Sequence, residues 1–299
     1  MNLPTEVNAY GLVGPTGAGF VNMMEKSGLG QTSMKYNVNL VTAPDAIVSK
    51  LTTGEADIAA IPTNLAASLY QKTNGGIQMI AINTECVLYF LENGNTIQSF
   101  DDFKGQTIYS TGEGSNPEYI LRYLLTQKGI DPDKDVTLKF VAENEELAAL
   151  LIKGEAKIAL VPEPLCTTVQ AKNQDLRIAV SVNEEWKAIN SKSPLMGCLV
   201  ATKAFIEKYP DALPVFLKEY KESIDGISDL NKSAELCEKY CIIASAEIAK
   251  KALPRCLITY IDGADMQPAI EDYFQVLFDA NPKSVGGKMP DAGFYYTAA

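Results

Sequence analysis

Glycines and short polar side chains follow a predicted strand near the start of the chain, where they offer groups that bind a polar ligand. Residues 14–19 read Gly-Pro-Thr-Gly-Ala-Gly, between an apolar run at 7–13 and a helical run that begins at Phe20. A tight loop that opens a helix presents backbone N–H groups, which suit an anionic or polar group. The loop lacks the spacing of a dinucleotide fingerprint and the Lys-Ser/Thr pair of a P-loop, so nucleotide binding is a weak interpretation. A tight strand-to-helix turn without a ligand explains the same glycines.

The chain contains no histidine. This excludes Ser/His and Cys/His catalysis, histidine-based zinc sites and the commonest general base. We predict no catalytic residues.

The six cysteines form no CxxC motif. Cys237 and Cys241 are four positions apart on a predicted helix, and Cys256 follows. We interpret the cysteines as small apolar residues, with a metal or redox cluster, or a disulfide between Cys256 and a helical cysteine, as the alternatives. We predict no metal and no cofactor, and cysteine usage does not settle the compartment.

A nine-residue stretch at 54–62 recurs at 154–162 with six identical residues. In each copy an apolar helical face precedes a Gly-Glu turn, an apolar run and a proline. Glycine suits a helix C-terminus, and an apolar run without polar alternation is typical of a strand that is covered on both faces. Thr63–Asn64 and Glu163 follow the two prolines, at the strand ends where open α/β sheets bind ligands.

Composition and charge are those of a globular protein. Apolar residues make up 46% of the 299, and the net charge is −11. The acidity argues against nucleic acid or an anionic membrane surface as a partner. No run is long and apolar enough to span a membrane, and no signal peptide is visible at Met1.

The order of elements predicts two α/β lobes. Glycine-rich turn, helix, strand, helix, Gly-Glu turn, strand and proline occur twice in the same order, and an apolar run at 196–202 returns the chain to the first lobe. We expect lobe one at 1–103 plus 197–299 and lobe two at 104–196.

Several motifs in order resemble the extracytoplasmic substrate-binding proteins of ABC importers, and most closely the aliphatic-sulfonate, taurine, nitrate and thiamine-precursor binders. The segments that carry this resemblance are Gly14-Pro-Thr-Gly17, residues 54–64, Cys86-Val-Leu-Tyr-Phe90, residues 111–115 and Pro162-Glu-Pro164. The resemblance covers nearly the whole chain.

This resemblance implies a type II periplasmic-binding-protein fold, with two similar α/β lobes and a ligand cleft between them. It implies hinges near 104–105 and 195–197, closure on a small-molecule ligand such as a sulfonate or a pyrimidine, and delivery to an ABC transporter permease. It also implies an extracytoplasmic location, in the periplasm or lipid-anchored at the cell surface, with a leader peptide that this sequence does not show. We expect a monomer.

By position in that fold, the ligand meets loops from both lobes. The expected ligand-binding residues are Tyr10, Gly14, Pro15, Thr16, Gly17, Thr63, Asn64, Asn83, Thr84, Thr111, Gly112, Gly114, Ser115, Asn116 and Glu163. Glu163 either accepts hydrogen bonds from an amine or aminopyrimidine, or is an acid favoured at a helix start. Tyr10 either stacks on a flat ligand or packs in the core. We expect Arg122 to point along its helix and to form a surface or inter-helix ion pair, which disfavours a sulfonate or nitrate site built on arginine.

Two other functions remain as alternatives. One is a ligand-sensing module, which would need a DNA-binding segment that the chain does not show. The other is an enzyme of the same fold, resembling the thiamine-pyrimidine synthase, which uses one of its own histidines and a cysteine-rich iron motif. The missing histidine argues strongly against that enzyme.

Overall fold

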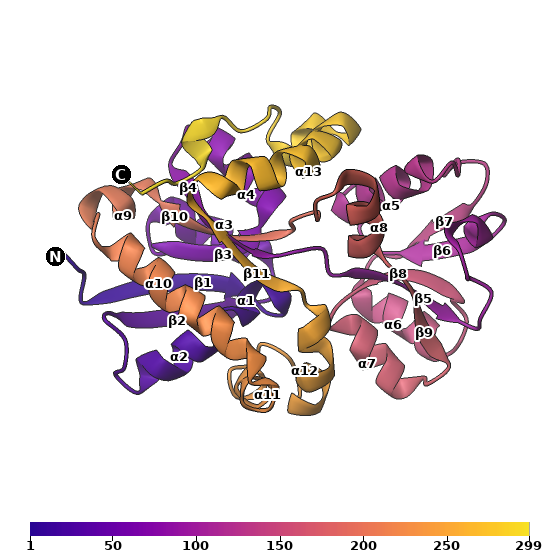
Figure 1. Ribbon diagram of the computed structural model, residues 1–299, viewed down its shortest axis with the longest axis horizontal. Coiled ribbons are helices and arrows are strands. Elements are labelled where there is room, and N and C mark those ends of the chain that lie inside the picture. Colours follow the sequence, from indigo (N-terminus) through magenta and orange to yellow (C-terminus); the bar gives the residue numbers. More distant parts are fainter. Residues whose placement is uncertain (299) are drawn as a thin grey trace. The chain divides into compact units, whose positions relative to one another are not determined.

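The computed structural model describes residues 1–298, which fall into two compact units. Unit 1 comprises Met1–Glu85 and Leu195–Ala299, and unit 2 comprises Cys86–Pro194. Each unit is built on one mixed sheet with helices on its faces (Figure 1). The two α/β units predicted from the sequence are therefore present.

Unit 1 contains a six-stranded sheet, sheet A, in the order β11-β4-β10-β3-β1-β2. Its strands are β1 (Glu6–Leu12), β2 (Lys35–Val41), β3 (Ile58–Pro62), β4 (Ile77–Thr84), β10 (Gly197–Thr202) and β11 (Ile258–Asp262). Strands β1, β2 and β3 are parallel, whereas β10 runs antiparallel between β3 and β4. Because β10 opposes both neighbours, β4 runs in the same direction as β3.

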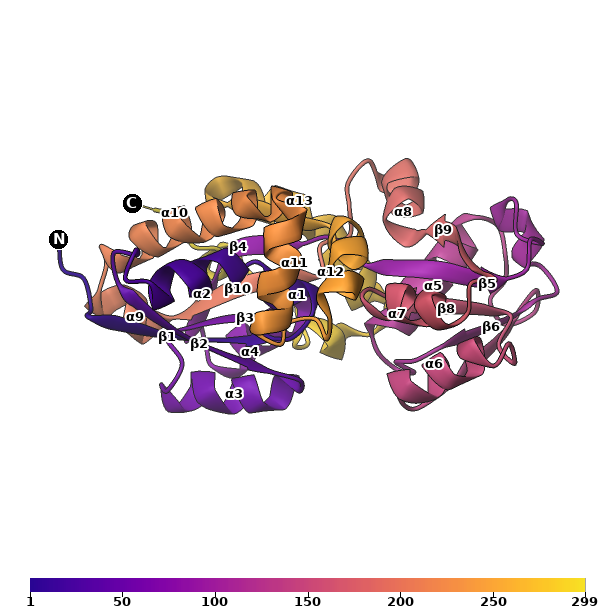
Figure 2. The same cartoon turned by 90° about the horizontal axis from the view of Figure 1, so that it is seen from below.

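Helices cover both faces of sheet A. They are α1 (Pro15–Ala18), α2 (Val21–Gly28), α3 (Pro44–Thr53), α4 (Thr63–Lys72), α9 (Lys203–Lys208), α10 (Ala212–Asp225), α11 (Leu230–Lys239), α12 (Ala246–Ala252) and α13 (Met266–Ala280). Helices α2 and α10 lie on one face and α3 on the other (Figure 2). Phe20, Phe216 and Tyr220 pack against sheet residues such as Ala60 and Leu199 in the core of the first face.

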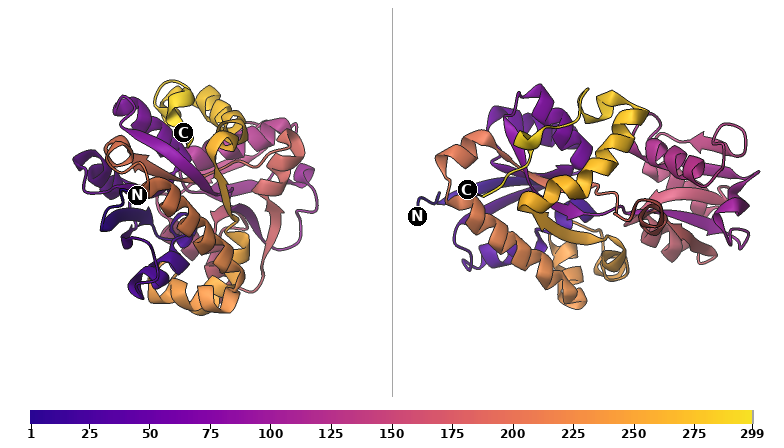
Figure 3. Two further views of the ribbon diagram at one scale, coloured as in Figure 1. Left: turned by 60° about the vertical axis from the view of Figure 1, so that its left-hand side comes forward. Right: turned by 45° about the horizontal axis from the view of Figure 1, so that its top comes forward.

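The C-terminal segment closes unit 1 along β4. The Tyr296 N–H donates to the carbonyl of Met79, and Phe294 is fully buried. This segment follows α13 and returns over the unit (Figure 3).

Unit 2 contains a five-stranded sheet, sheet B, in the order β7-β6-β8-β5-β9. Its strands are β5 (Leu88–Asn93), β6 (Thr107–Ser110), β7 (Thr137–Phe140), β8 (Ile158–Pro162) and β9 (Leu176–Ser181). Its helices are α5 (Asn116–Gln127), α6 (Asn144–Ile152), α7 (Leu165–Lys172) and α8 (Val182–Asn190). Strands β6, β7 and β8 are parallel, and β5 runs antiparallel between β8 and β9.

The two sheets share one topology, which explains the sequence repeat. Leu199 of β10 pairs with Ala60 of β3, and Phe90 of β5 pairs with Leu160 of β8 at the corresponding position. In each unit, the chain enters from the other unit and then directly forms the antiparallel strand, which is β5 in unit 2 and β10 in unit 1. The segment 86–103, expected in lobe one, therefore lies in unit 2, because β5 is hydrogen-bonded within sheet B. The chain crosses at Glu85–Cys86 and at Pro194–Leu195.

None of the six cysteines forms a disulfide, and only Cys241 is exposed. In the part of the chain that the structure describes, no helix has the length and apolar character needed to cross a membrane. The same residues include no group of three or more Cys, Asp and Glu side chains placed to hold a metal ion.

Candidate functional site

The glycine-rich loop after β1 is compact because two of its glycines allow close backbone approach. Gly14 has φ 86°, and its N–H donates to the carbonyl of Ile242. A Cβ on Gly17 would lie 2.1 Å from the Leu12 carbonyl oxygen. The loop therefore requires these glycines whether or not it binds a ligand.

Asn83 and Thr84, at the end of β4, hold this loop in place. Asn83 is 1% exposed, and its Nδ2 donates to the Thr16 carbonyl at 2.9 Å and to Tyr220 Oη at 3.0 Å. Thr84 Oγ1 donates to Asn83 Oδ1 at 2.9 Å. The structure thus brings Asn83, Thr84 and Thr16 together and uses the amide of Asn83 within the protein.

Thr63 and Asn64 begin α4 at the same edge of sheet A. Thr63 is fully buried, and its Oγ1 donates to the Leu195 carbonyl at 2.8 Å. Asn64 is half-buried, and its side-chain amide makes no hydrogen bond with any of residues 1–298. Of the two, Asn64 is the residue with hydrogen-bonding capacity left for a ligand.

Tyr10 lies in the middle of β1, paired with Asn39 and Ala59, and does not end the strand. Its phenol lies near Lys50 of α3, whose pKa is raised chiefly by its hydrogen bond to Glu55 and to a smaller extent by Tyr10. Tyr10 therefore faces a helix of its own unit.

In unit 2 the loop at 111–116 folds back on itself. Gly112 has φ 78° and Gly114 has φ 70°. Ser115 Oγ donates to the Gly112 carbonyl at 2.7 Å, and Tyr119 Oη donates to the Gly114 carbonyl at 2.7 Å. Gly114 and Ser115 are exposed directly before α5, but their N–H groups donate to Glu118 Oε1 at 3.4 Å and to the Gly112 carbonyl at 3.1 Å.

Two further loop residues, Thr111 and Asn116, flank that turn, and both are half-buried. Thr111 Oγ1 lies 3.2 Å from Asn144 Oδ1 at the start of α6, to which it donates. Asn116 is the first residue of α5. Both residues therefore lie at the carboxyl end of β6, where the sequence placed them.

Glu163 follows β8 and is 2% exposed. Its carboxylate accepts from Thr167 Oγ1 at 3.0 and 3.1 Å and from the Thr167 N–H at 3.3 Å. The Glu163 N–H donates to the Val87 carbonyl. These contacts favour the role of an acid at the start of α7 over that of a ligand contact.

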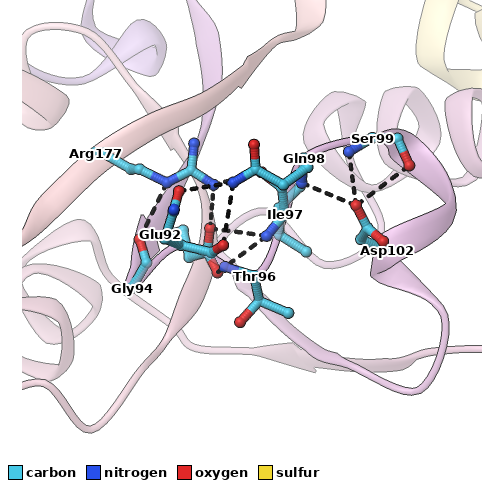
Figure 4. A network of polar contacts seen from close by, with 9 residues as sticks. Glu92, Gly94, Thr96, Ile97, Gln98, Ser99, Asp102 and Arg177 are labelled. Atoms are coloured by element: carbon cyan, nitrogen blue, oxygen red, sulfur yellow. Dashed lines mark hydrogen bonds and ion pairs between the residues drawn. The ribbon is translucent and has the colours of Figure 1, made fainter.

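The arginines of unit 2 are engaged with carboxylates. Arg177 Nη2 lies 2.6 Å from Glu92 Oε2, in a network that also includes the Thr96 and Ile97 N–H groups (Figure 4). Burial acts to raise the pKa of Glu92, but the hydrogen bonds from Ile97, Thr96 and Arg177 outweigh it and lower that pKa. Arg177 is thus part of an internal network.

Arg122 pairs with Asp133 at 2.8 Å and with Glu118 at 3.6 Å. The expected surface ion pair of Arg122 is therefore present. Trp186 is 2% exposed and lies 4.6 Å from Tyr123, ring centre to ring centre. It covers α5 within unit 2.

In each unit, the parallel strands bring the expected loops to one edge. In unit 1 these are the loops after β1, β3 and β4, and in unit 2 those after β6 and β8. Sequence reasoning missed Tyr220 and Ile242, which support the first loop from about two hundred positions away. No local spacing signals such a contact. The loops offer amides, hydroxyls and backbone N–H groups, which suit hydrogen bonding of a small polar solute.

The sequence matches the family described as "ABC transporter, phosphonate, periplasmic substrate-binding protein" over residues 19–226, which is more than half of the chain. No curated protein sequence matches it significantly.

Solved structures share the fold. An ABC transporter protein from Parabacteroides distasonis is 24% identical with a TM-score of 0.84, covering 99% of this chain and 100% of that one. The periplasmic aliphatic sulphonate binding protein SsuA from Escherichia coli is 15% identical with a TM-score of 0.73, covering 95% and 96%. The periplasmic nitrate-binding protein NrtA from Synechocystis PCC 6803 is 16% identical with a TM-score of 0.60, covering 83% and 70%.

These structures confirm the type II periplasmic-binding-protein fold inferred from the motif order. The family match over residues 19–226 shows that the chain belongs to the phosphonate family of periplasmic substrate-binding proteins of ABC transporters.

Proposed function

We propose that the protein captures a small polar solute between its two units and delivers it to an ABC-type permease for uptake. The observation that carries this proposal is that both sheets have the same kind of loop at the carboxyl ends of their parallel strands. In each unit these loops contain glycines and side chains with amide or hydroxyl groups. A solute that touches both edges would bind the closed form better and shift the population towards it. The hinges would lie where the chain passes between the units, at Glu85–Cys86 and Pro194–Leu195.

Neutral donors carry most of the proposed recognition. Arg122 and Arg177 are held by carboxylates of unit 2. The side-chain groups left for the solute are the Asn64 amide and the Thr16 hydroxyl, whereas the Gly114 and Ser115 N–H groups donate to Glu118 Oε1 and to the Gly112 carbonyl. Each such hydrogen bond contributes about 0.5–1.5 kcal/mol, so several, with burial, reach micromolar affinity, about −8 kcal/mol.

The proposed solute class is a phosphonate, a sulfonate or an aminopyrimidine. Seven other residues of the expected set support the loops: Gly14, Pro15, Gly17, Thr63, Asn83, Thr84 and Glu163. We place the protein outside the cytoplasmic membrane, periplasmic or lipid-anchored, and acting as a monomer.

The test is a thermal-shift panel of alkylphosphonates, aliphatic sulfonates, nitrate and aminopyrimidines, followed by small-angle scattering with the best ligand. We expect a raised melting temperature with one class and a smaller radius of gyration on binding. No shift with any class, together with an unchanged radius, would rule the proposal out.

A matched pair of variants locates the site. Asn64→Ala removes a half-buried amide at the loop edge, and Asn39→Ala removes an exposed amide on β2 of the same unit. We expect about tenfold weaker binding for the first variant and unchanged binding for the second. Equal affinities would remove Asn64 from the site.

A further inference from the structure

Unit 1 contains a cavity of about 470 Å³ at the edge of sheet A opposite the loops discussed above. Asp57 directly precedes β3, Ile77 begins β4, and Thr202 ends the antiparallel β10, and all three line the cavity. The proposed solute loops follow the other ends of these strands. The volume falls within the range of small-molecule sites, about 300–1,000 Å³.

One wall of the cavity is apolar. Leu51 of α3, Leu69 of α4 and Phe205 of α9 line it together with Ile77. All four residues are buried, so only a small part of each side chain is exposed. The wall suits a branched aliphatic body.

The threonine hydroxyl groups of the cavity are engaged within the protein. Thr52 Oγ1 donates to the Ser49 carbonyl, and Thr73 Oγ1 donates to the Leu69 carbonyl at 2.7 Å. Thr202 Oγ1 accepts from the Phe205 N–H. The side-chain groups left for a ligand are the Tyr209 hydroxyl and the two charged groups, Asp57 and Lys208, and the charged groups form the stronger hydrogen bonds.

Asp57 and Lys208 have opposite charges but form no ion pair with each other or with any other of residues 1–298. Asp57 Oδ2 accepts from the Asn8 N–H at 2.8 Å, whereas Oδ1 accepts no hydrogen bond in the described chain. Burial raises the pKa of Asp57, opposed by the Asn8 hydrogen bond and the charge of Lys208. Lys208 Nζ lies 5.1 Å from the centre of the Tyr209 ring, which leaves its N–H donors available.

We propose that this cavity is a second ligand site, which binds a small zwitterion with an aliphatic body, such as a branched amino acid. The ligand's ammonium group donates to Asp57 Oδ1, its carboxylate accepts from Lys208 Nζ, and its aliphatic part packs on Leu51, Leu69 and Phe205. A singly charged ligand would leave one of the two charged groups unmatched, and an uncharged ligand would leave both unmatched.

The test uses calorimetric titration of the full chain with L-leucine as the probe. Two analogues each lack one charge: 4-methylpentanoate lacks the ammonium group and isopentylamine lacks the carboxylate. We expect saturable binding of L-leucine and at least about tenfold weaker binding of both analogues. Absence of saturable L-leucine binding would overturn the proposal.

Variants assign the binding to this cavity. Asp57→Asn keeps an oxygen acceptor for the Asn8 N–H, and Lys208→Gln removes the other charge. Lys203→Gln is the control, because Lys203 lies on the same helix, faces Glu207 at 3.8 Å and does not line the cavity. We expect the first two to weaken L-leucine binding at least about tenfold and the control to leave it unchanged.

Failure of this second site is distinguishable from failure of the proposed solute site. L-Leucine binding that is lost in Asn64→Ala and retained in Asp57→Asn and Lys208→Gln would overturn the proposal, because it would place the zwitterion at the solute loops. Binding lost in Asp57→Asn and Lys208→Gln and retained in Asn64→Ala would support it.

Discussion

Asn83 Nδ2 donates to Tyr220 Oη at 3.0 Å, although the two residues are 137 positions apart. The same amide donates to the Thr16 carbonyl, so α10 and the glycine-rich loop meet at one side chain. Tyr220 also sits directly on Gly19, where an added Cβ would lie 2.1 Å from Tyr220 Oη. The loop that we propose to bind the solute is therefore supported by the second segment of unit 1.

We predict that Tyr220→Phe lowers the free energy of unfolding by about 1–2 kcal/mol, because it leaves a buried donor of Asn83 unsatisfied. Urea denaturation measures this change. Tyr209→Phe is the control, because the Tyr209 hydroxyl makes no hydrogen bond with any of residues 1–298, and we expect a change below about 0.5 kcal/mol. Equal losses in the two variants would contradict the role given to the Asn83–Tyr220 contact.

Alanine variants of Gly112 and Gly105 distinguish the effect of loop shape from the effect of backbone strain. Both have positive φ, 78° and 79°. A Cβ at Gly112 would lie 2.8 Å from Pro117 Cγ, whereas a Cβ at Gly105 would meet nothing within 4 Å. We predict that both Gly→Ala variants lose about 1–2 kcal/mol of stability from the left-handed conformation, and that Gly112→Ala loses more.

Only Gly112→Ala should weaken solute binding, since only it must displace the start of α5. Calorimetry with the ligand found in the thermal-shift panel measures this difference. An affinity lowered equally in Gly105→Ala would show that global strain, and not loop geometry, controls binding.

The repeat at 54–62 and 154–162 predicts most of the fold, because periodicity and turn residues are local signals. It places β3 and β8 at matching positions, and the prolines mark their ends. The sequence did not show that residues 86–103 belong to unit 2. That depends on β5 pairing with β8 and β9, which lie some 70 to 90 positions further along the chain, and long-range pairing leaves no trace in local spacing.

The sequence predicts where the candidate loops lie, but it does not predict what their polar residues do. Thr63, Asn83 and Glu163 lie where the strand ends place them, yet their polar groups are used by Leu195, Tyr220 and Thr167. A short polar residue after a strand has the same sequence signature whether it contacts a ligand or holds a loop. Only its partners distinguish the two.

Arg177 stabilises unit 2 through a planar set of donors. Its Nε donates to the Gly94 carbonyl at 3.0 Å, and its Nη2 donates to Glu92 and to the Ile97 carbonyl. Lysine cannot reproduce this geometry, so we predict that Arg177→Lys lowers the free energy of unfolding by about 2 kcal/mol. Urea denaturation at neutral pH measures the loss.

Arg122→Lys is the matched control, because its partner Asp133 is exposed and such surface pairs contribute less than about 1 kcal/mol. The loss in Arg177→Lys should also depend on pH. Since the folded pKa of Glu92 is lowered, its contribution is present above the unfolded pKa and disappears as the pH falls through the folded pKa. A loss in Arg177→Lys that stays constant into acid would contradict this account.

The Glu163→Gln variant distinguishes two roles of Glu163, which are support of α7 and contact with the ligand. The variant removes a negative charge at the start of the helix and weakens the bonds from Thr167. We predict a stability loss of about 0.5–1 kcal/mol with solute affinity unchanged. An affinity that falls about tenfold or more with little change in melting temperature would instead make Glu163 a ligand contact.

Asp57 should make the protein less stable as the pH rises. Burial raises its folded pKa above the ordinary value of 3.8, so the folded state holds this proton more tightly than the unfolded state. The resulting penalty is absent below the unfolded pKa, and it grows as the pH rises to the folded pKa. We predict that Asp57→Asn, which cannot ionise, is more stable than the unmodified protein at about pH 7.

That advantage should disappear at about pH 3, where Asp57 is protonated in both states. Urea denaturation at the two pH values measures it, with Asp175→Asn as the control, because Asp175 is exposed on unit 2. We expect the control to change stability by less than about 0.5 kcal/mol at either pH. An Asp57→Asn variant that is less stable than the unmodified protein at neutral pH would mean that the Asn8 and Lys208 contacts outweigh burial, and the carboxylate would then be satisfied without a ligand.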